Sequence, residues 1–149
     1  MSNINGVVVT YPKQIPDNRG TVRHFVTNEN MKSFAECYTT SIYKDIIKGW
    51  HGYYTKTLYY CVPVGLIKLV LFDYRKNSPT YHEIQEIYLG PENYSRVEIP
   101  PGILSAFQGV GSPLSLAVLA ADEIFDETKT MRFPIKNDFI AYDWSHINR

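Results

Sequence analysis

The sequence predicts an all-β protein, organised as a jelly roll with little helix. Runs of β-branched and aromatic residues recur at intervals of roughly ten residues, and residues that favour turns separate them. Twelve tyrosines and seven phenylalanines supply large side chains that such strands bury. Strands spaced in this way are typical of sandwiches and barrels, whose interior can hold a small ligand.

The N-terminal half contains runs that are rich in valine, isoleucine, threonine and tyrosine. The strands predicted there are residues 7–11, 21–27, 37–43 and 46–54. Pro12 ends the first run, and Asp-Asn-Arg-Gly at residues 17–20 has the composition of a turn. Lys44 and Asp45 form the turn between the last two runs, and glycines 49 and 52 interrupt the second of these.

The C-terminal half continues the same pattern. The strands predicted there are residues 58–64, 66–74, 83–89, 96–99 and 114–121. Glycine, proline and asparagine mark the turns between them, at residues 64–65, 76–79, 90–93, 100–102 and 111–113. Residues 28–34 can form one or two helical turns, and residues 124–130 are too short for a substantial helix.

Length and composition narrow the class of protein. The 149 residues predict a single domain over residues 1–149. Fifteen basic and fifteen acidic residues cancel, which argues against a general nucleic-acid or anionic-membrane binder. Cys37 and Cys61 form no Cys-x-x-Cys pair, and are interpreted as buried thiols of a reducing compartment. No signal-like or membrane-spanning run is present, so we expect a cytoplasmic protein.

The histidines do not predict a metal site. His24, His51, His82 and His146 are scattered singly, whereas a metal site in a β-barrel of this kind needs several ligands that converge. The aromatic, strand-like segment that contains His51 is the most informative part of the chain, because it combines this imidazole with the Lys48 cation. A histidine in such a strand is either a hydrogen-bonded core residue or, in a cavity wall, a proton-transfer group.

Several short motifs occur in an order that resembles the dTDP-4-dehydrorhamnose 3,5-epimerase family. They are Asp-Asn-Arg-Gly at 17–20, Lys-Gly-Trp-His at 48–51, Phe-Asp-Tyr-Arg at 72–75, Ser-Pro-Thr-Tyr at 78–81, Leu-Gly-Pro-Glu-Asn at 89–93 and Ile-Pro-Pro-Gly at 99–102. Each motif is weak alone, but together they span most of the chain. The resemblance implies a metal-free cupin fold, no cofactor, and a nucleotide-linked 4-keto-6-deoxy sugar as substrate.

The resemblance also implies roles for particular residues. His51 matches the base that removes a proton beside the ketone, a task that suits a group with a pKa of about 6.5. Lys56 matches a lysine that stabilises the enolate, and Arg19 matches an arginine that binds the diphosphate. Lys48 stands where the family usually has arginine, and Tyr53 is a candidate for contact with the substrate if it does not merely pack the core.

The chain departs from the family at other positions. Counting back from Asp122 places Val118 where the family has its acid tyrosine. Ser105 replaces a histidine and Glu36 replaces a glutamine, both at positions expected to contact the sugar. The family's aspartate that orients the base has no counterpart here at its expected position. Asp73 and Asp143 are the alternatives considered for this role.

Three functions are compatible with these residues. The first is epimerisation at C3 only, because the family's tyrosine is associated with protonation at C5. The second is a nucleotide-sugar-binding module that has lost turnover, and the third is 3,4-ketoisomerisation on the same scaffold. The resemblance further implies a role in deoxysugar or surface-polysaccharide synthesis and a homodimer in which Arg19 or its neighbours reach the partner's pocket.

Overall fold

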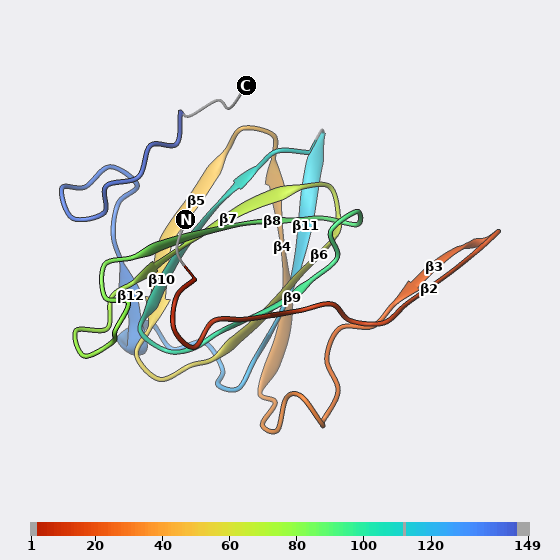
Figure 1. Cartoon of the computed structure of the whole chain (residues 1–149), viewed down its shortest axis with the longest axis horizontal. Helices are drawn as coiled ribbons and strands as arrows, with labels where there is room; N and C mark the ends of the chain where they lie inside the picture. Colours follow the sequence, from red (N-terminus) through yellow and green to blue (C-terminus); the bar gives the residue numbers. More distant parts are fainter. Residues whose placement is uncertain (1–2, 112, 146–149) are drawn as a thin grey trace.

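Two five-stranded antiparallel sheets face each other, which confirms the prediction of an all-β jelly roll (Figure 1). The computed structural model describes residues 3–111 and 113–145. The sheet that we call the β4 sheet consists, in spatial order, of β1 (Val8–Thr10), β9 (Arg96–Ile99), β6 (Leu58–Val64), β11 (Leu114–Ala121) and β4 (Glu36–Tyr43). The β5 sheet consists of β12 (Thr130–Arg132), β5 (Ile47–Tyr53), β10 (Ile103–Gly109), β7 (Ile67–Asp73) and β8 (Ile84–Leu89).

The main core fills the space between the two sheets. Alternate residues of β11, namely Ala117, Leu119 and Ala121, are buried there, since successive strand residues point to opposite faces. Leu69 and Leu71 of β7 reach the same core from the other sheet. Strand β7 is buried over its whole length, so its second face must also be covered.

The C-terminal segment covers that second face of the β5 sheet. Phe133, Ile135, Tyr142 and Trp144 pack against a cluster of outward-facing residues that includes Trp50 and Phe72. The ring centroids of Trp50 and Trp144 are 5.9 Å apart. The buried Lys68 Nζ lies 5.1 Å from the ring centres of both Tyr142 and Trp144, contacts in which the aromatic rings attract the cation. The segment therefore seals the sheet without being a strand of it.

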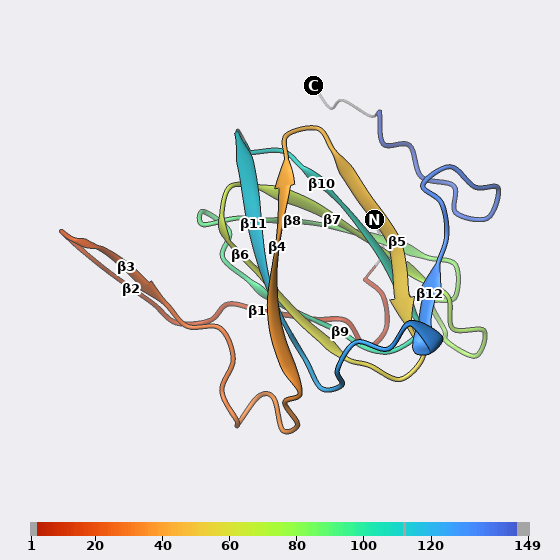
Figure 2. The same cartoon turned by 180° about the vertical axis from the view of Figure 1, so that it is seen from behind.

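A hairpin formed by β2 (Gln14–Asp17) and β3 (Gly20–Arg23) projects away from both sheets (Figures 1 and 2). Its side chains are mostly exposed, including the apolar Ile15 and Val22. A two-stranded hairpin is marginally stable by itself in water.

Strands β2, β10 and β12 were not among the strands predicted from the sequence. The most important omission is β10, which pairs with β5 on one side and β7 on the other. Its small residues, such as Ser105, Ala106 and Gly109, have weak β-propensity, and pairing on both edges holds it in the sheet. Of the one or two helical turns considered for residues 28–34, the structure has a single turn, closed by a 2.9 Å hydrogen bond from the Met31 N–H to the Thr27 carbonyl. The region 124–130 contains the 3-10 turn η1 (Glu127–Lys129) and the start of β12. No helix of residues 3–111 and 113–145 is long and apolar enough to cross a bilayer.

A bulge in β5 sets the direction of its functional side chains. Gly49 is opposite Ala106 and His51 is opposite Ser105, so Trp50 is an extra residue between two adjacent partners. Trp50 packs in the outer cluster, whereas Ser105, the cross-strand partner of His51, is itself opposite the core residue Leu71. His51 therefore faces the space between the sheets. Gly49 has φ of +137°, and a Cβ there would lie 2.5 Å from the Ala106 Cβ.

We expect Gly49→Ala to lower the free energy of unfolding by about 2–5 kcal/mol, because backbone strain and overpacking each cost about 1–3 kcal/mol. Denaturant unfolding measures the loss. Gly20→Ala is the matched control, since Gly20 has φ of +149° but a Cβ added there would have no atom within 4 Å. Equal losses in the two variants would show that packing against Ala106 is unimportant.

Candidate active site

A pocket of about 320 Å³ lies between strand β4 of one sheet and strands β5 and β12 of the other. Its lining residues are Glu36, Tyr38, His51, Tyr53, Phe125 and Arg132. Three of these, Glu36, His51 and Tyr53, were predicted from the sequence as site residues. The pocket thus combines an imidazole, two phenols, a carboxylate and a guanidinium, and these groups suit proton transfer on a polar ligand.

His51 is half-buried in this pocket. Burial lowers the pKa of its imidazole, the positive charge of Arg132 lowers it further, and the carboxylate of Glu127 opposes both effects. Desolvation and a like charge both disfavour the imidazolium, so His51 is neutral near pH 7 and can accept a proton. Within residues 3–111 and 113–145, no carboxylate hydrogen-bonds to the His51 ring.

Arg132 and Glu127 are site residues that the sequence reasoning missed. Arg132 is the cross-strand partner of His51, and its guanidinium donates to both carboxylate oxygens of Glu127 at 2.9 and 3.0 Å. The pair holds opposite charges beside the imidazole. Glu127 and Arg132 are five residues apart, so the sequence shows that an acidic and a basic side chain are close along the chain. Nothing in the sequence indicates that this segment lies next to β5.

Tyr38 and Tyr53 line the pocket from opposite sheets. Tyr53 is on β5, two residues after His51, and Tyr38 is on β4 in the opposite sheet. Burial raises the pKa of both phenols, and the side chains are close enough to share a hydrogen bond. Both groups are therefore protonated at neutral pH. Tyr38 was not a predicted site residue, because a tyrosine in a strand ordinarily packs a core.

Lys56 lies at the edge of the pocket. It is 5 % exposed, and its Nζ is 4.3 Å from the centre of the Tyr53 ring and 5.8 Å from that of Phe125. It forms no ion pair with any residue in the part of the chain that the structure describes. Hydrogen bonds of 2.9 Å from Thr55 to Glu123 and from the Thr57 N–H to Asp122 fix the turn that carries it. A buried cation beside two aromatic rings is available to a negative charge on a ligand.

The other residues predicted on these strands lie near the pocket without lining it. Ser105 is opposite His51, and its Oγ donates to the His51 carbonyl at 3.4 Å. Lys48 donates from Nζ to the Ser41 carbonyl at 2.7 Å and to Thr40 Oγ1 at 3.2 Å. Lys48 therefore bridges β5 to β4 in this conformation, although its side chain remains exposed.

Arg19 lies outside this pocket. It is at the tip of the β2–β3 hairpin, 85 % exposed, and pairs with Asp17 at 2.6 Å. The hairpin extends away from the sheets in both views (Figures 1 and 2). Arg19 is therefore not among the residues that line the His51 pocket of the same chain.

The structure also changes the interpretation of Val118. This residue is opposite Thr39 on β4 and Cys61 on β6, whereas the next residue, Leu119, is opposite Tyr38. Because neighbouring strand residues point to opposite faces, Val118 lies on the outer face of the β4 sheet and does not line the pocket. The inward-facing Leu119 is equally unable to donate a proton.

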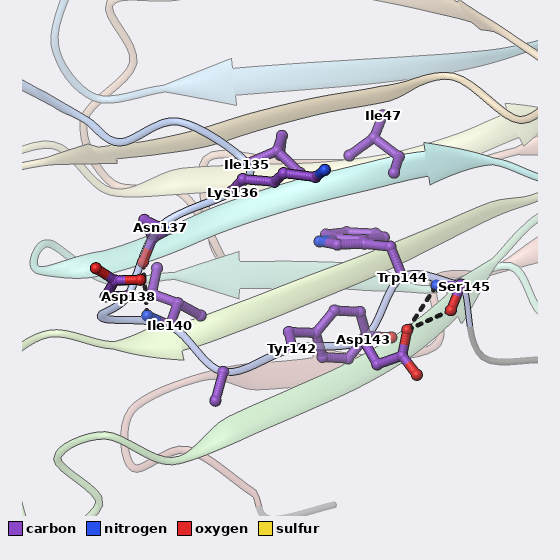
Figure 3. Close-up of a pocket in the computed structure, with 11 residues that line it drawn as sticks. Ile47, Ile135, Lys136, Asn137, Asp138, Ile140, Tyr142, Asp143, Trp144 and Ser145 are labelled. Atoms are coloured by element: carbon purple, nitrogen blue, oxygen red, sulfur yellow. Dashed lines mark hydrogen bonds between the residues drawn. The ribbon is translucent and has the colours of Figure 1, made fainter.

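Asp73 and Asp143, the considered partners of His51, are both outside the pocket. Asp73 is fully buried, and accepts hydrogen bonds from Arg75, Ser78 and Thr80. Burial alone would raise its pKa, but these bonds outweigh burial and bring the pKa to about 2. Asp143 accepts bonds of 2.9 and 2.6 Å from the backbone and hydroxyl of Ser145 (Figure 3).

A larger and more open hollow of about 770 Å³ lies along the C-terminal segment (Figure 3). Ile47, Tyr142, Asp143 and Trp144 are among its lining residues, but none of the predicted site residues is. It lies on the outer face of the β5 sheet, where Trp50 points, whereas His51 faces inward. Among residues 3–111 and 113–145, no three His, Cys, Asp or Glu side chains are grouped so that they could hold a metal ion.

Comparisons with known proteins show the family to which the chain is related. Residues 1–149 match the family model described as dTDP-4-dehydrorhamnose 3,5-epimerase. The spore coat polysaccharide biosynthesis protein SpsL of Bacillus subtilis is 25 % identical over 146 residues, which cover 95 % of this chain and 97 % of SpsL. The probable low-salt glycan biosynthesis epimerase Agl13 of Haloferax volcanii is 26 % identical over 111 residues, or 72 % of this chain and 71 % of Agl13.

A solved structure shares both the fold and part of the sequence. The crystal structure of a dTDP sugar isomerase from Desulfovibrio desulfuricans G20 superposes with a TM-score of 0.91 at 28 % identity. The match covers 97 % of this chain and 94 % of that one. The cupin-like fold expected from the sequence is thereby confirmed.

We expect Arg132→Gln to raise the pKa of His51 and Glu127→Gln to lower it. Removing Arg132 takes away a positive charge that disfavours the imidazolium, and it leaves Glu127 unpaired, which acts in the same direction. Removing Glu127 takes away the opposing negative charge. NMR titration of the imidazole protons measures both shifts, with His24 and His82 as internal references. Movement of His51 in the opposite directions would contradict this account of its charge environment.

Proposed function

The chain belongs to the dTDP-4-dehydrorhamnose 3,5-epimerase family, and we propose that it inverts C3 of a nucleotide-linked 4-keto-6-deoxyhexose. The observation that carries the proposal is His51, a neutral imidazole that faces a pocket lined by polar groups. A pocket of about 320 Å³ suits one sugar ring, while the nucleotide would extend beyond it.

Proton abstraction by His51 is the first step. The proton on C3 is acidic because C3 is next to the C4 ketone, so its removal leaves an enolate whose charge is mainly on oxygen. His51 accepts that proton and becomes imidazolium, which Glu127 stabilises and Arg132 destabilises. The low pKa of His51 makes it available as a base over the whole neutral range.

Lys56 is the proposed partner of the enolate oxygen. Its ammonium group is buried beside Tyr53 and forms no ion pair with the described residues, so its charge is not neutralised by a protein carboxylate. A preorganised cation in a water-poor pocket stabilises developing negative charge more strongly than water does. Glu36 and Ser105 are proposed to contact the sugar hydroxyls, and Lys48 is proposed to contact the diphosphate.

Inversion at C3 alone is proposed from the residues of β11. The family's acid tyrosine is associated with C5, and β11 holds no tyrosine on either face: Val118 points outward, and Leu119 faces Tyr38. Without a proton donor for C5, proton abstraction by His51 leads to inversion at C3 only. The names of the relatives SpsL and Agl13 support a place in polysaccharide or glycan synthesis.

We propose a homodimer in which the β2–β3 arm of each chain enters the partner's site. The arm projects away from the sheets, carries exposed apolar residues, and holds Arg19, which does not line the pocket of its own chain. A symmetric exchange of arms would bury these residues and bring each guanidinium to a diphosphate.

Deuterium uptake tests the reaction. In heavy water, we expect NMR to show deuterium at C3 but not C5 of dTDP-4-keto-6-deoxyglucose, together with the C3 epimer. His51→Asn should slow both by about 100- to 10,000-fold, the usual contribution of a general base. Uptake at C5 together with the C5-inverted sugar would show that both centres are inverted, and a ketone moved to C3 would indicate ketoisomerisation. Binding of dTDP without any uptake would favour the binding module.

Mixing two inactive variants tests the exchanged arm. His51→Asn and Arg19→Ala each disable both sites of a dimer that consists of one variant alone. After subunit exchange at equal amounts, half of the dimers are mixed, and one site in each regains both residues, so activity should return to about a quarter of wild type. No recovery, with mixed dimers detected by native mass spectrometry, would show that Arg19 does not act across the interface.

A further inference from the structure

We propose that Tyr38 is the proton donor at C3, with Tyr53 as its hydrogen-bond partner; this inference rests on the proposed epimerase function. An inversion needs an acid on the side of the sugar ring opposite the base. His51 is on β5, and Tyr38 is the phenol that enters the same pocket from β4, in the facing sheet. A planar enolate bound between the two walls would have the imidazole on one face and this phenol on the other.

The register of β4 explains why this tyrosine can replace the residue missing from β11. Tyr38 is the direct cross-strand partner of Leu119, the residue of β11 that faces inward next to Val118. Paired residues in antiparallel strands lie about 5 Å apart and share one face of the sheet. A phenol on β4 can therefore reach the same part of the cavity as a side chain on β11.

Two other tyrosines, Tyr53 and Tyr60, interact with Tyr38. Tyr53 is close enough to share a hydrogen bond with Tyr38. Tyr60 is 2 % exposed, its hydroxyl has no hydrogen-bond partner among the described residues, and it interacts electrostatically with Tyr38. A buried hydroxyl without a partner is costly and uncommon.

The proton balance closes within these groups. His51 takes the proton from C3, and the electrons of the C3–H bond move into the enolate. As the C4 carbonyl re-forms, the Tyr38 O–H bond breaks and its proton is added to C3 from the opposite face. The Tyr38 phenolate then takes the hydroxyl proton of Tyr53, which is restored from solvent, while imidazolium His51 returns its proton to solvent. Burial raises the pKa of Tyr38, so the donor is fully protonated before each turnover.

Deuterium exchange and inversion, measured together, test the donor. In heavy water, Tyr38→Phe should still exchange the C3 proton of unconverted substrate, because His51 can return a deuteron to the same face. Formation of the C3 epimer should fall about 100- to 10,000-fold, the usual effect of losing a general acid. Tyr53→Phe should give a smaller loss, since it removes only the partner. Tyr43→Phe is the matched control on the same strand, where the tyrosine is 70 % exposed.

The outcomes distinguish failure of the proposed donor from failure of the proposed epimerase function. Epimer formation at the wild-type rate in Tyr38→Phe, with exchange intact, would overturn the donor and leave the epimerase function standing. An equal loss of exchange and inversion in a folded variant, with unchanged thermal unfolding, would show that Tyr38 serves binding or abstraction and would also overturn it. No exchange by the wild type would overturn the epimerase function and the donor together.

Discussion

The bulge of β5 against β10 is the constraint on which the rest of the structure depends. A regular strand would alternate without interruption, and Lys48 and His51 would then point to opposite faces. The extra residue at Trp50 lets Lys48 pair with Phe107 and His51 with Ser105, both on the inner side of the sheet. Trp50 meanwhile anchors the outer cluster that the C-terminal segment covers. The bulge requires Gly49, because Ala106 occupies the space of a side chain.

The charges around His51 differ from those of a histidine that a buried carboxylate orients. Arg132 and Glu127 neutralise each other through two hydrogen bonds, and they act on the imidazole from β12 and the turn before it. The net effect, with burial, favours the neutral base. The position of His51 is set instead through its backbone. The Ser105 hydroxyl donates a hydrogen bond to the His51 carbonyl, and β12 pairs with the other edge of β5. His51 is therefore a weaker base than a histidine oriented by a buried carboxylate, but it stays neutral over a wider pH range.

Sequence reasoning recovered most of the strands because their β-branched and aromatic runs are long and turn residues bound them. It missed β10, whose small residues carry no β-signal and whose place is fixed by pairing with two neighbours. It identified His51, Tyr53 and Glu36, which line the pocket, from motifs and a resemblance. It missed Tyr38, Arg132 and Glu127, because each is an ordinary residue of its own segment and becomes informative only beside β5.

By itself, the sequence determined the all-β class, the family and the identity of the candidate base, since these depend on local composition and on motifs that are contiguous in the chain. Only the tertiary structure decided which residues meet that base. Counting along β11 pointed to Val118, but the register with β4 turns that residue outward and places Leu119 opposite Tyr38. The physical reason is the two-residue period of a strand: a shift of one residue, invisible in composition, moves a side chain to the other face.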